Sequence, residues 1–120
     1  MEQYKLGEME QRFADLIWQH QPIASGELVK RCQEALGWKK STTYTMLRRL
    51  CDRGIFENRQ GTVTALLSRE DFLGARGEQF LTETFGGSLP QFVAAFTRRN
   101  KLTKKEIDEI QRLIDAYQEE

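Results

Sequence analysis

Apolar residues recur near the start of the chain with the spacing of an amphipathic helix. Met9, Phe13 and Ile17 follow one another at intervals of four residues, which places them on one side of a helix that we predict from about Gly7 to Gln19. Pro22 lies beyond the end of this helix and separates it from the next element. The chain is therefore predicted to open with a helix that buries one face.

Two further helices follow, each with residues that favour a start and a stop. Ser25 can cap the second helix, and Gly37 can end it in the left-handed conformation. Ser41 can cap the third helix, which we predict over Thr42–Arg53 with Gly54 as its stop. The pattern indicates three short helices joined by tight connections.

The third helix has two different faces. At ~100° per residue, the inner face consists of Thr43, Tyr44, Leu47, Leu50 and Cys51. The outer face is polar and basic and consists of Thr42, Thr45, Arg48, Arg49, Asp52 and Arg53. Such a helix can bury one side in a core and present the other to a charged partner.

The pattern after Gly54 changes to one typical of strands. We predict strands over residues 55–59 and 62–67, with Gln60-Gly61 as the turn between them. Three helices followed by a hairpin is the order of a winged helix-turn-helix, in which the third helix enters the major groove of DNA. We assign residues 1–68 to such a DNA-binding domain.

Residues 69–120 are predicted to form three more helices that carry apolar stripes. Ser68 begins the first, Gly86-Gly87 ends it, and a capping box at Thr103–Glu106 begins the last. The expected fold is mainly α with a small β-hairpin wing, followed by C-terminal dimerisation helices. A second copy of the chain is the expected cover for the stripes. The expected interface residues are Phe72, Phe80, Leu89, Phe92, Val93, Phe96, Ile107, Ile110, Leu113, Ile114 and Tyr117.

The net charge is zero, but the charges are distributed unevenly. Residues 28–62 contain eight basic and three acidic residues, a net charge of +5. Residues 69–120 contain eight basic and ten acidic residues, a net charge of −2. A basic segment followed by an acidic one suits a protein that binds DNA with one part only.

The candidate DNA contacts lie on the third helix, on the approach to it and on the hairpin. Arg49, beside Thr42 and Thr45, can present its guanidinium to guanine O6 and N7. Arg48 and Arg53 are expected at the rim of the face, where they would contact phosphates. The full set is Lys39, Lys40, Ser41, Thr42, Thr45, Arg48, Arg49, Arg53, Arg59 and Thr62.

An alternative interpretation is a winged-helix module for protein–protein interaction without specific DNA binding. The apolar seam of the last helix could then engage a different protein. The hydroxyl and arginine side chains of the third helix distinguish the two hypotheses, because a surface that binds only protein does not need them beside so many cations.

Other function classes find little support in the sequence. Cys32 and Cys51 are expected to be buried, reduced thiols, and with His20 they are too few for a zinc site. Motifs of nucleophilic, phosphate-binding or metalloprotease sites are not found, so we expect neither an enzyme nor a cofactor. Apolar runs such as 92–96 are far shorter than the ~18 residues of a membrane span, which predicts a cytoplasmic protein without membrane insertion.

The run WKKSTTYTMLRRL at residues 38–50, followed by Arg53-Gly54-Ile55, resembles the penicillinase-repressor family of transcriptional regulators. Three further segments are in register with that family, at residues 16–18, 86–89 and 102–107, so the resemblance covers nearly the whole chain. It implies a homodimer that binds double-stranded DNA at a dyad-symmetric operator and represses transcription, with the C-terminal helices intertwined. It also implies base and phosphate contacts by Ser41, Thr42, Thr45 and Arg49.

The chain departs from the family pattern in four places. Ser41 stands where lysine is frequent, so Lys39 or Lys40 is expected to supply that phosphate contact. Thr62 and Leu66 stand where the wing often has Arg and Tyr, and Arg59 is the expected substitute. A sensor-linked protease is the partner implied by the best-known members, which are cut at an Asn-Phe bond, but the matching pair here is Ala95-Phe96. The cysteine cluster of copper-responsive members has no counterpart at the C-terminus.

Overall fold

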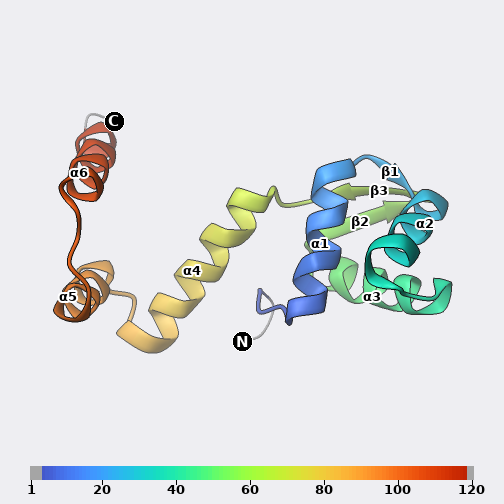
Figure 1. Ribbon diagram of the computed structural model, residues 1–120, viewed down its shortest axis with the longest axis horizontal. Coiled ribbons are helices and arrows are strands. Elements are labelled where there is room, and N and C mark those ends of the chain that lie inside the picture. The colour runs from blue at the N-terminus through green and yellow to red at the C-terminus, as the bar shows by residue number, and fades with distance from the viewer. Residues whose placement is uncertain (1–3, 119–120) are drawn as a thin grey trace. The chain divides into compact units, whose positions relative to one another are not determined.

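The computed structural model describes residues 4–118 and consists mainly of helices with one small sheet. The helices are α1 (Glu8–His20), α2 (Ser25–Leu36), α3 (Lys40–Asp52), α4 (Arg69–Phe85), α5 (Leu89–Arg99) and α6 (Lys104–Gln118) (Figure 1). The strands are β1 (Ile23–Ala24), β2 (Phe56–Arg59) and β3 (Thr62–Ala65). This order confirms the predicted fold class, a winged helix followed by C-terminal helices. The chain divides into two compact units, residues 1–80 and 81–120.

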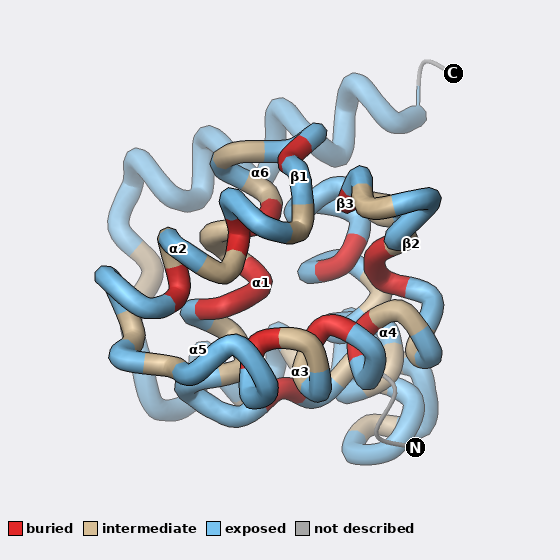
Figure 2. Tube along the Cα trace, turned by 90° about the vertical axis from the view of Figure 1, so that its right-hand side faces the viewer, coloured by how far each residue is buried: buried red, intermediate tan, exposed pale blue. Residues whose placement is uncertain are grey.

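The core of the first unit lies where α1, α2 and α3 pack together beside the sheet (Figures 1 and 2). Each helix contributes most of the apolar side that its periodicity predicted, for example Phe13 and Ile17 from α1 and Leu28 from α2. Met9 is the exception, because it was predicted on the inner side of α1 but is 39% exposed. A buried side chain of this size contributes roughly 1.5–3 kcal/mol to folding. The fully or nearly fully buried apolar residues are Leu6, Phe13, Ala14, Ile17, Ile23, Leu28, Cys32, Leu47, Leu50, Ile55, Phe56, Val63 and Phe72.

The sheet has three antiparallel strands in the order β1-β3-β2. The predicted hairpin is present, and Gln60 and Gly61 form its turn with φ values of 53° and 86°. Glycine suits the second position because it adopts positive φ without steric cost. Strand β1 was not predicted, since two residues are too short to show any alternation. Ile23 is buried and pairs with Val63, so this short strand closes the core.

Two predicted helix starts are displaced, that of α3 by two residues and that of α2 by one. Lys39, not Ser41, is the N-cap of α3, and the helix begins at Lys40. Ser25 is likewise the first residue of α2, after the N-cap Ala24. The lysine carbonyl at position 39 accepts hydrogen bonds from the Thr43 N–H (3.0 Å) and hydroxyl (3.2 Å). The first turn of α3 is therefore closed by the chain before Ser41, without a side-chain cap.

The predicted caps of α4 and α6 are confirmed. Ser68 Oγ accepts the Asp71 N–H at 3.0 Å. Thr103 Oγ1 accepts the Glu106 N–H at 3.1 Å, and Glu106 Oε1 accepts the Thr103 N–H at 2.9 Å. This reciprocal pair satisfies two backbone donors that the helix itself leaves unpaired.

The prediction that Phe72 lies at a dimer interface is wrong. Its side chain is fully buried in the core of the first unit, with its ring 5.3 Å from Trp18 and 5.9 Å from Tyr4. An ion pair also joins the first turn of α4 to α1, since Arg69 Nε lies 2.9 Å from Asp15 Oδ1. The first unit accordingly includes the start of α4, beyond the boundary proposed at residue 68.

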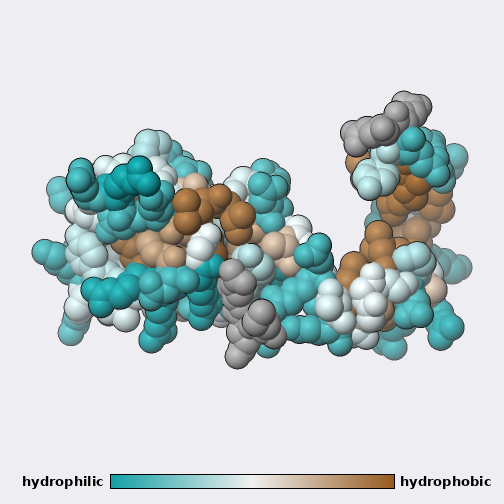
Figure 3. Space-filling model, turned by 180° about the vertical axis from the view of Figure 1, so that it is seen from behind, coloured by the Kyte–Doolittle hydropathy of each residue, from teal (hydrophilic) through white to brown (hydrophobic). Residues whose placement is uncertain are grey.

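The second unit buries little of its apolar surface. Rings at Phe85, Phe92 and Phe96 contact one another in sequence, at 5.6 and 6.0 Å between centroids. None of the described residues of α5 and α6 is buried, and apolar side chains gather on both helices (Figures 2 and 3). A helix that could cross a membrane is not found among residues 4–118.

Candidate nucleic-acid interface

The connection between α2 and α3 is a short turn that the sequence defines closely. Gly37 ends α2 in the left-handed conformation, at a φ of 68°. The next N–H, from Trp38, donates to the Cys32 carbonyl at 3.3 Å. The Trp38 ring then packs 5.2 Å from Phe13 on α1. These contacts fix the point at which α3 leaves the turn.

The inner face of α3 fixes how the helix is rotated about its axis. Leu47 and Leu50 are buried in the core, and Thr43 is only 1% exposed. The Thr43 hydroxyl is satisfied by the Lys39 carbonyl, so its burial leaves no unpaired polar group. With these three residues inside, the opposite side of the helix must face solvent.

The exposed side of α3 carries the side chains that the sequence predicted as DNA contacts. Ser41, Thr42, Thr45, Arg48 and Arg49 are all exposed. Four of them, with the half-buried Met46, line a shallow depression, and only Arg48 lies outside it. Short hydroxyl side chains let a helix approach base edges closely, and an arginine fork matches the acceptors of guanine.

Arg49 is held along this depression by a weak contact on its own helix. Its Nη1 lies 3.7 Å from Met46 Sδ. Lys39 and Lys40 are exposed at the start of the same helix. The structure thus brings two lysines, three hydroxyl side chains and Arg49 to one surface, as the sequence predicted.

Arg53 does not belong to this surface. Its Nη1 donates to the Lys5 carbonyl at 3.2 Å and lies 4.0 Å from Glu10 Oε2. As the C-cap of α3, this residue has turned toward the segment that precedes α1. Because its guanidinium is engaged within the first unit, we no longer expect Arg53 to contact phosphates.

The wing presents Arg59 and Thr62 on either side of its turn. Both residues are exposed, at the end of β2 and the start of β3. Arg59 Nη2 is 2.8 Å from Glu57 Oε1, so a neighbouring carboxylate partly neutralises its charge. The wing has the cation that the sequence predicted, but the positive charge there is weaker than on the outer face of α3.

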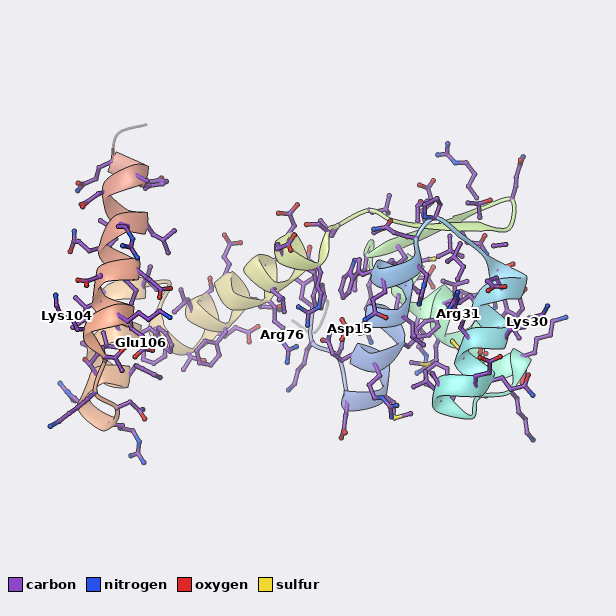
Figure 4. All side chains as sticks on the ribbon, turned by 45° about the horizontal axis from the view of Figure 1, so that its top comes forward. Asp15, Lys30, Arg31, Arg76, Lys104 and Glu106 are labelled. Atoms are coloured by element: carbon purple, nitrogen blue, oxygen red, sulfur yellow. The ribbon has the colours of Figure 1, made fainter. Side chains whose placement is uncertain are left out.

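Two cations of α2 differ in their surroundings (Figure 4). Arg31 lies on the side toward α1, where its Nη1 is 3.3 Å from His20 Nε2, and its Nε is 3.5 Å from Glu27 Oε1. Lys30 is exposed on the outer side. Both residues belong to the basic segment identified in the sequence, where neither was assigned a role. They point to different sides of α2 because successive residues are rotated about the helix axis.

Neither thiol is built as a reactive site. Burial raises the pKa of Cys32, and burial together with the nearby Asp52 carboxylate raises the pKa of Cys51. Both are free cysteines that stay protonated near neutral pH. Among residues 4–118, no three side chains of the His, Cys, Asp or Glu type come together as metal ligands.

Comparison with known proteins places the whole arrangement in one family. The family model for penicillinase repressors matches residues 6–116. The penicillinase repressor of Bacillus licheniformis is 25% identical over 117 residues, which cover 94% of this chain and 91% of that protein. The family match spans both the surface of α3 and the C-terminal helices. The chain therefore belongs to the penicillinase repressor family.

Proposed function

We propose that this protein represses transcription by binding double-stranded operator DNA as a homodimer, with α3 in the major groove. The observation that carries the proposal is the outer face of α3, where Thr42, Thr45 and Arg49 line one depression. Arg49 would read a guanine, and the two threonines would contact adjacent base edges or methyl groups. Lys39 and Lys40 would hold neighbouring phosphates, which fix the register of the helix on the duplex.

The second copy of the chain is the proposed cover for the apolar faces of the C-terminal helices. Six such side chains at ~1.5–3 kcal/mol each would together contribute roughly 9–18 kcal/mol, enough to offset typical association costs of roughly 4–15 kcal/mol over most of that range. Phe72 is removed from the expected set because it is buried within its own chain. The exposed members are Phe80, Leu89, Val93, Phe96, Ile107, Ile110, Leu113, Ile114 and Tyr117, with Phe92 half-buried beside them.

Two-fold symmetry then determines the form of the operator. Each protomer would insert α3 into one half-site, so the operator should be a palindrome. The half-sites should lie about one helical turn apart, or a multiple of it. A dimer bound over a promoter would exclude RNA polymerase directly, which is the simplest route to repression.

The alternative function is a module that binds another protein through the exposed faces of α5 and α6. Those faces favour it as much as they favour a homodimer. It gives no role, however, to the threonines and arginines exposed on α3. Family membership also indicates a regulator rather than an enzyme.

A sensor-linked protease stays a predicted partner. The pair that matches the family's cleaved bond, Ala95-Phe96, lies inside the continuous helix α5. Ala95 is half-buried there, so a protease would need to open the helix locally before cutting. Mass spectrometry of the chain from induced cells would show whether this bond is cut.

Selection of bound fragments from the source genome by the purified protein tests the proposed function. The wild-type chain should enrich a small set of palindromic sites. A variant with Thr42→Ala, Thr45→Ala and Arg49→Ala keeps the inner face of α3 and should enrich none of them. A wild-type chain that enriches no site at all would refute DNA-specific repression and support the protein-binding alternative.

A further inference from the structure

Three elements of the proposed DNA-binding surface meet at Ser25, the first residue of α2. Its N–H donates to the Gly61 carbonyl in the hairpin turn at 2.8 Å. Its Oγ accepts a hydrogen bond from the Tyr44 hydroxyl on α3 at 3.1 Å. A single residue thus connects the proposed recognition helix, the helix before it and the wing.

The hairpin turn that Ser25 holds is itself closely defined. Asn58 Oδ1 accepts the Gly61 N–H at 3.1 Å, so Gly61 uses both its backbone donor and its acceptor in fixed contacts. Beside the turn, Ala24 pairs with Thr62 across β1 and β3. Arg59 and Thr62 flank this turn, so whatever fixes the turn also fixes the proposed wing contacts.

Tyr44 is placed at the boundary between the two faces of α3. Thr43, before it, is buried in the core, and Thr45, after it, is exposed in the proposed base-reading face. Tyr44 is half-buried and lines a hollow between α3 and β2 together with Arg48 and Asn58. A hydroxyl bond from this position links the rotation of α3 to the start of α2, and through Ser25 to the wing.

We propose that Tyr44 and Ser25 are positioning residues that hold the wing at one fixed place relative to the outer face of α3. This inference rests on the proposed function, because it concerns how two parts of one DNA surface are aligned. When the link is lost, the wing samples more orientations, and only a fraction of the molecules present Arg59 and Thr62 correctly. The apparent affinity for operator is then the intrinsic affinity multiplied by that fraction.

The first test compares operator binding of the full-length chain with that of Tyr44→Phe. Loss of one neutral hydrogen bond corresponds to about a two- to tenfold rise in Kd. Tyr4→Phe is the matched control, because it makes the same chemical change on a ring that packs against Phe72. The control should bind like wild type, and an unchanged Kd for Tyr44→Phe would overturn the proposal.

The second test repeats the substitution where the wing contacts are already absent. In an Arg59→Ala, Thr62→Ala background, misplacing the wing should no longer matter, so Tyr44→Phe should cost nothing further. An equal loss in both backgrounds would overturn the proposal and assign the Tyr44 hydroxyl to a direct phosphate contact or to general stability. Ser25→Ala should reproduce the loss and should not add to it.

A third measurement needs no DNA. Hydrogen exchange at the Ser25 amide, followed by NMR, should be faster in Tyr44→Phe than in wild type or Tyr4→Phe, because the junction opens more often. Unchanged exchange would refute the junction. Failure of the wild-type chain to bind any DNA would refute the proposed function, whereas binding that is indifferent to Tyr44→Phe would refute only the positioning role.

Discussion

Arg48, Arg49 and Arg53 have the same side chain and lie close together on or at the end of α3, yet their surroundings differ. Arg49 lies with the threonines in the outer depression, and Arg48 lines the hollow beside the wing. Arg53 donates to the Lys5 carbonyl instead. Periodicity predicted that all three avoid the core, but it could not identify which one a neighbouring segment would engage.

Arg49→Ala should weaken operator binding by ~1–3 kcal/mol and relax the preference at one base pair in each half-site, because a bidentate guanine contact is lost. Titrations against the operator and its single-base variants would measure both effects. If the variant bound more weakly but kept the full base preference, Arg49 would be a phosphate contact and not a base reader.

Arg48→Ala and Arg53→Ala should behave differently from each other. Arg48→Ala should weaken binding to all sequences alike and lower the salt slope by about 1, as expected for one lost phosphate contact. Arg53→Ala should leave that slope unchanged and lower the free energy of unfolding by about 1 kcal/mol, because it removes a hydrogen bond within the first unit. A reduced salt slope for Arg53→Ala would restore it to the DNA surface.

The helices and the hairpin were predictable because local signals agree with the tertiary structure. Apolar spacing located the inner faces of α1, α2 and α3, and Gly37 and Gly61 occupy the left-handed positions their turns require. The start of α2 was misplaced by one residue and that of α3 by two, because a serine near each helix start was taken as the cap. Strand β1 depends on pairing with the distant β3, which no local pattern can reveal.

Helix α4 contains two glycines, Gly74 and Gly77, at positions where the structure has room for a side chain. An added Cβ would meet nothing within 4 Å at either position. Replacing both with alanine should therefore raise the free energy of unfolding by roughly 0.4–1 kcal/mol each. Chemical denaturation would measure this gain. Gly37→Ala is the control and should destabilise, since its φ is +68°. A loss of stability in the α4 variants would contradict the prediction.

The sequence was least informative about which surfaces of the whole molecule cover one another. Apolar stripes showed that α4, α5 and α6 need partners, but a stripe does not say which surface covers it. Phe72 and Phe80 belong to the same helix, yet Phe72 is fully buried within its own chain and Phe80 is 48% exposed. The DNA face was more predictable, because its chemistry lies on one helix whose rotation the core determines.

Ile110→Asp combined with Ile114→Asp should abolish the proposed dimer. Both side chains are nearly half-exposed on one side of α6, and burying two charges between protomers is strongly unfavourable. Sedimentation should show a monomer, and operator affinity should fall with it because one half-site contributes only part of the binding energy. Lys105→Asp with Arg112→Asp changes more charge on the opposite face of α6 and should leave the dimer intact. A dimer that survived the isoleucine changes would place the interface elsewhere.

The most direct test of major-groove reading by a symmetric dimer is methylation protection of guanine N7 on the selected operator, since N7 lies in that groove. Wild-type protein should protect guanines in two half-sites related by a dyad and about one helical turn, or a multiple of it, apart. Arg49→Ala should lose one protected guanine in each half-site. Tight binding with no protected N7 in either half-site would contradict the account, because α3 would then not be in the major groove.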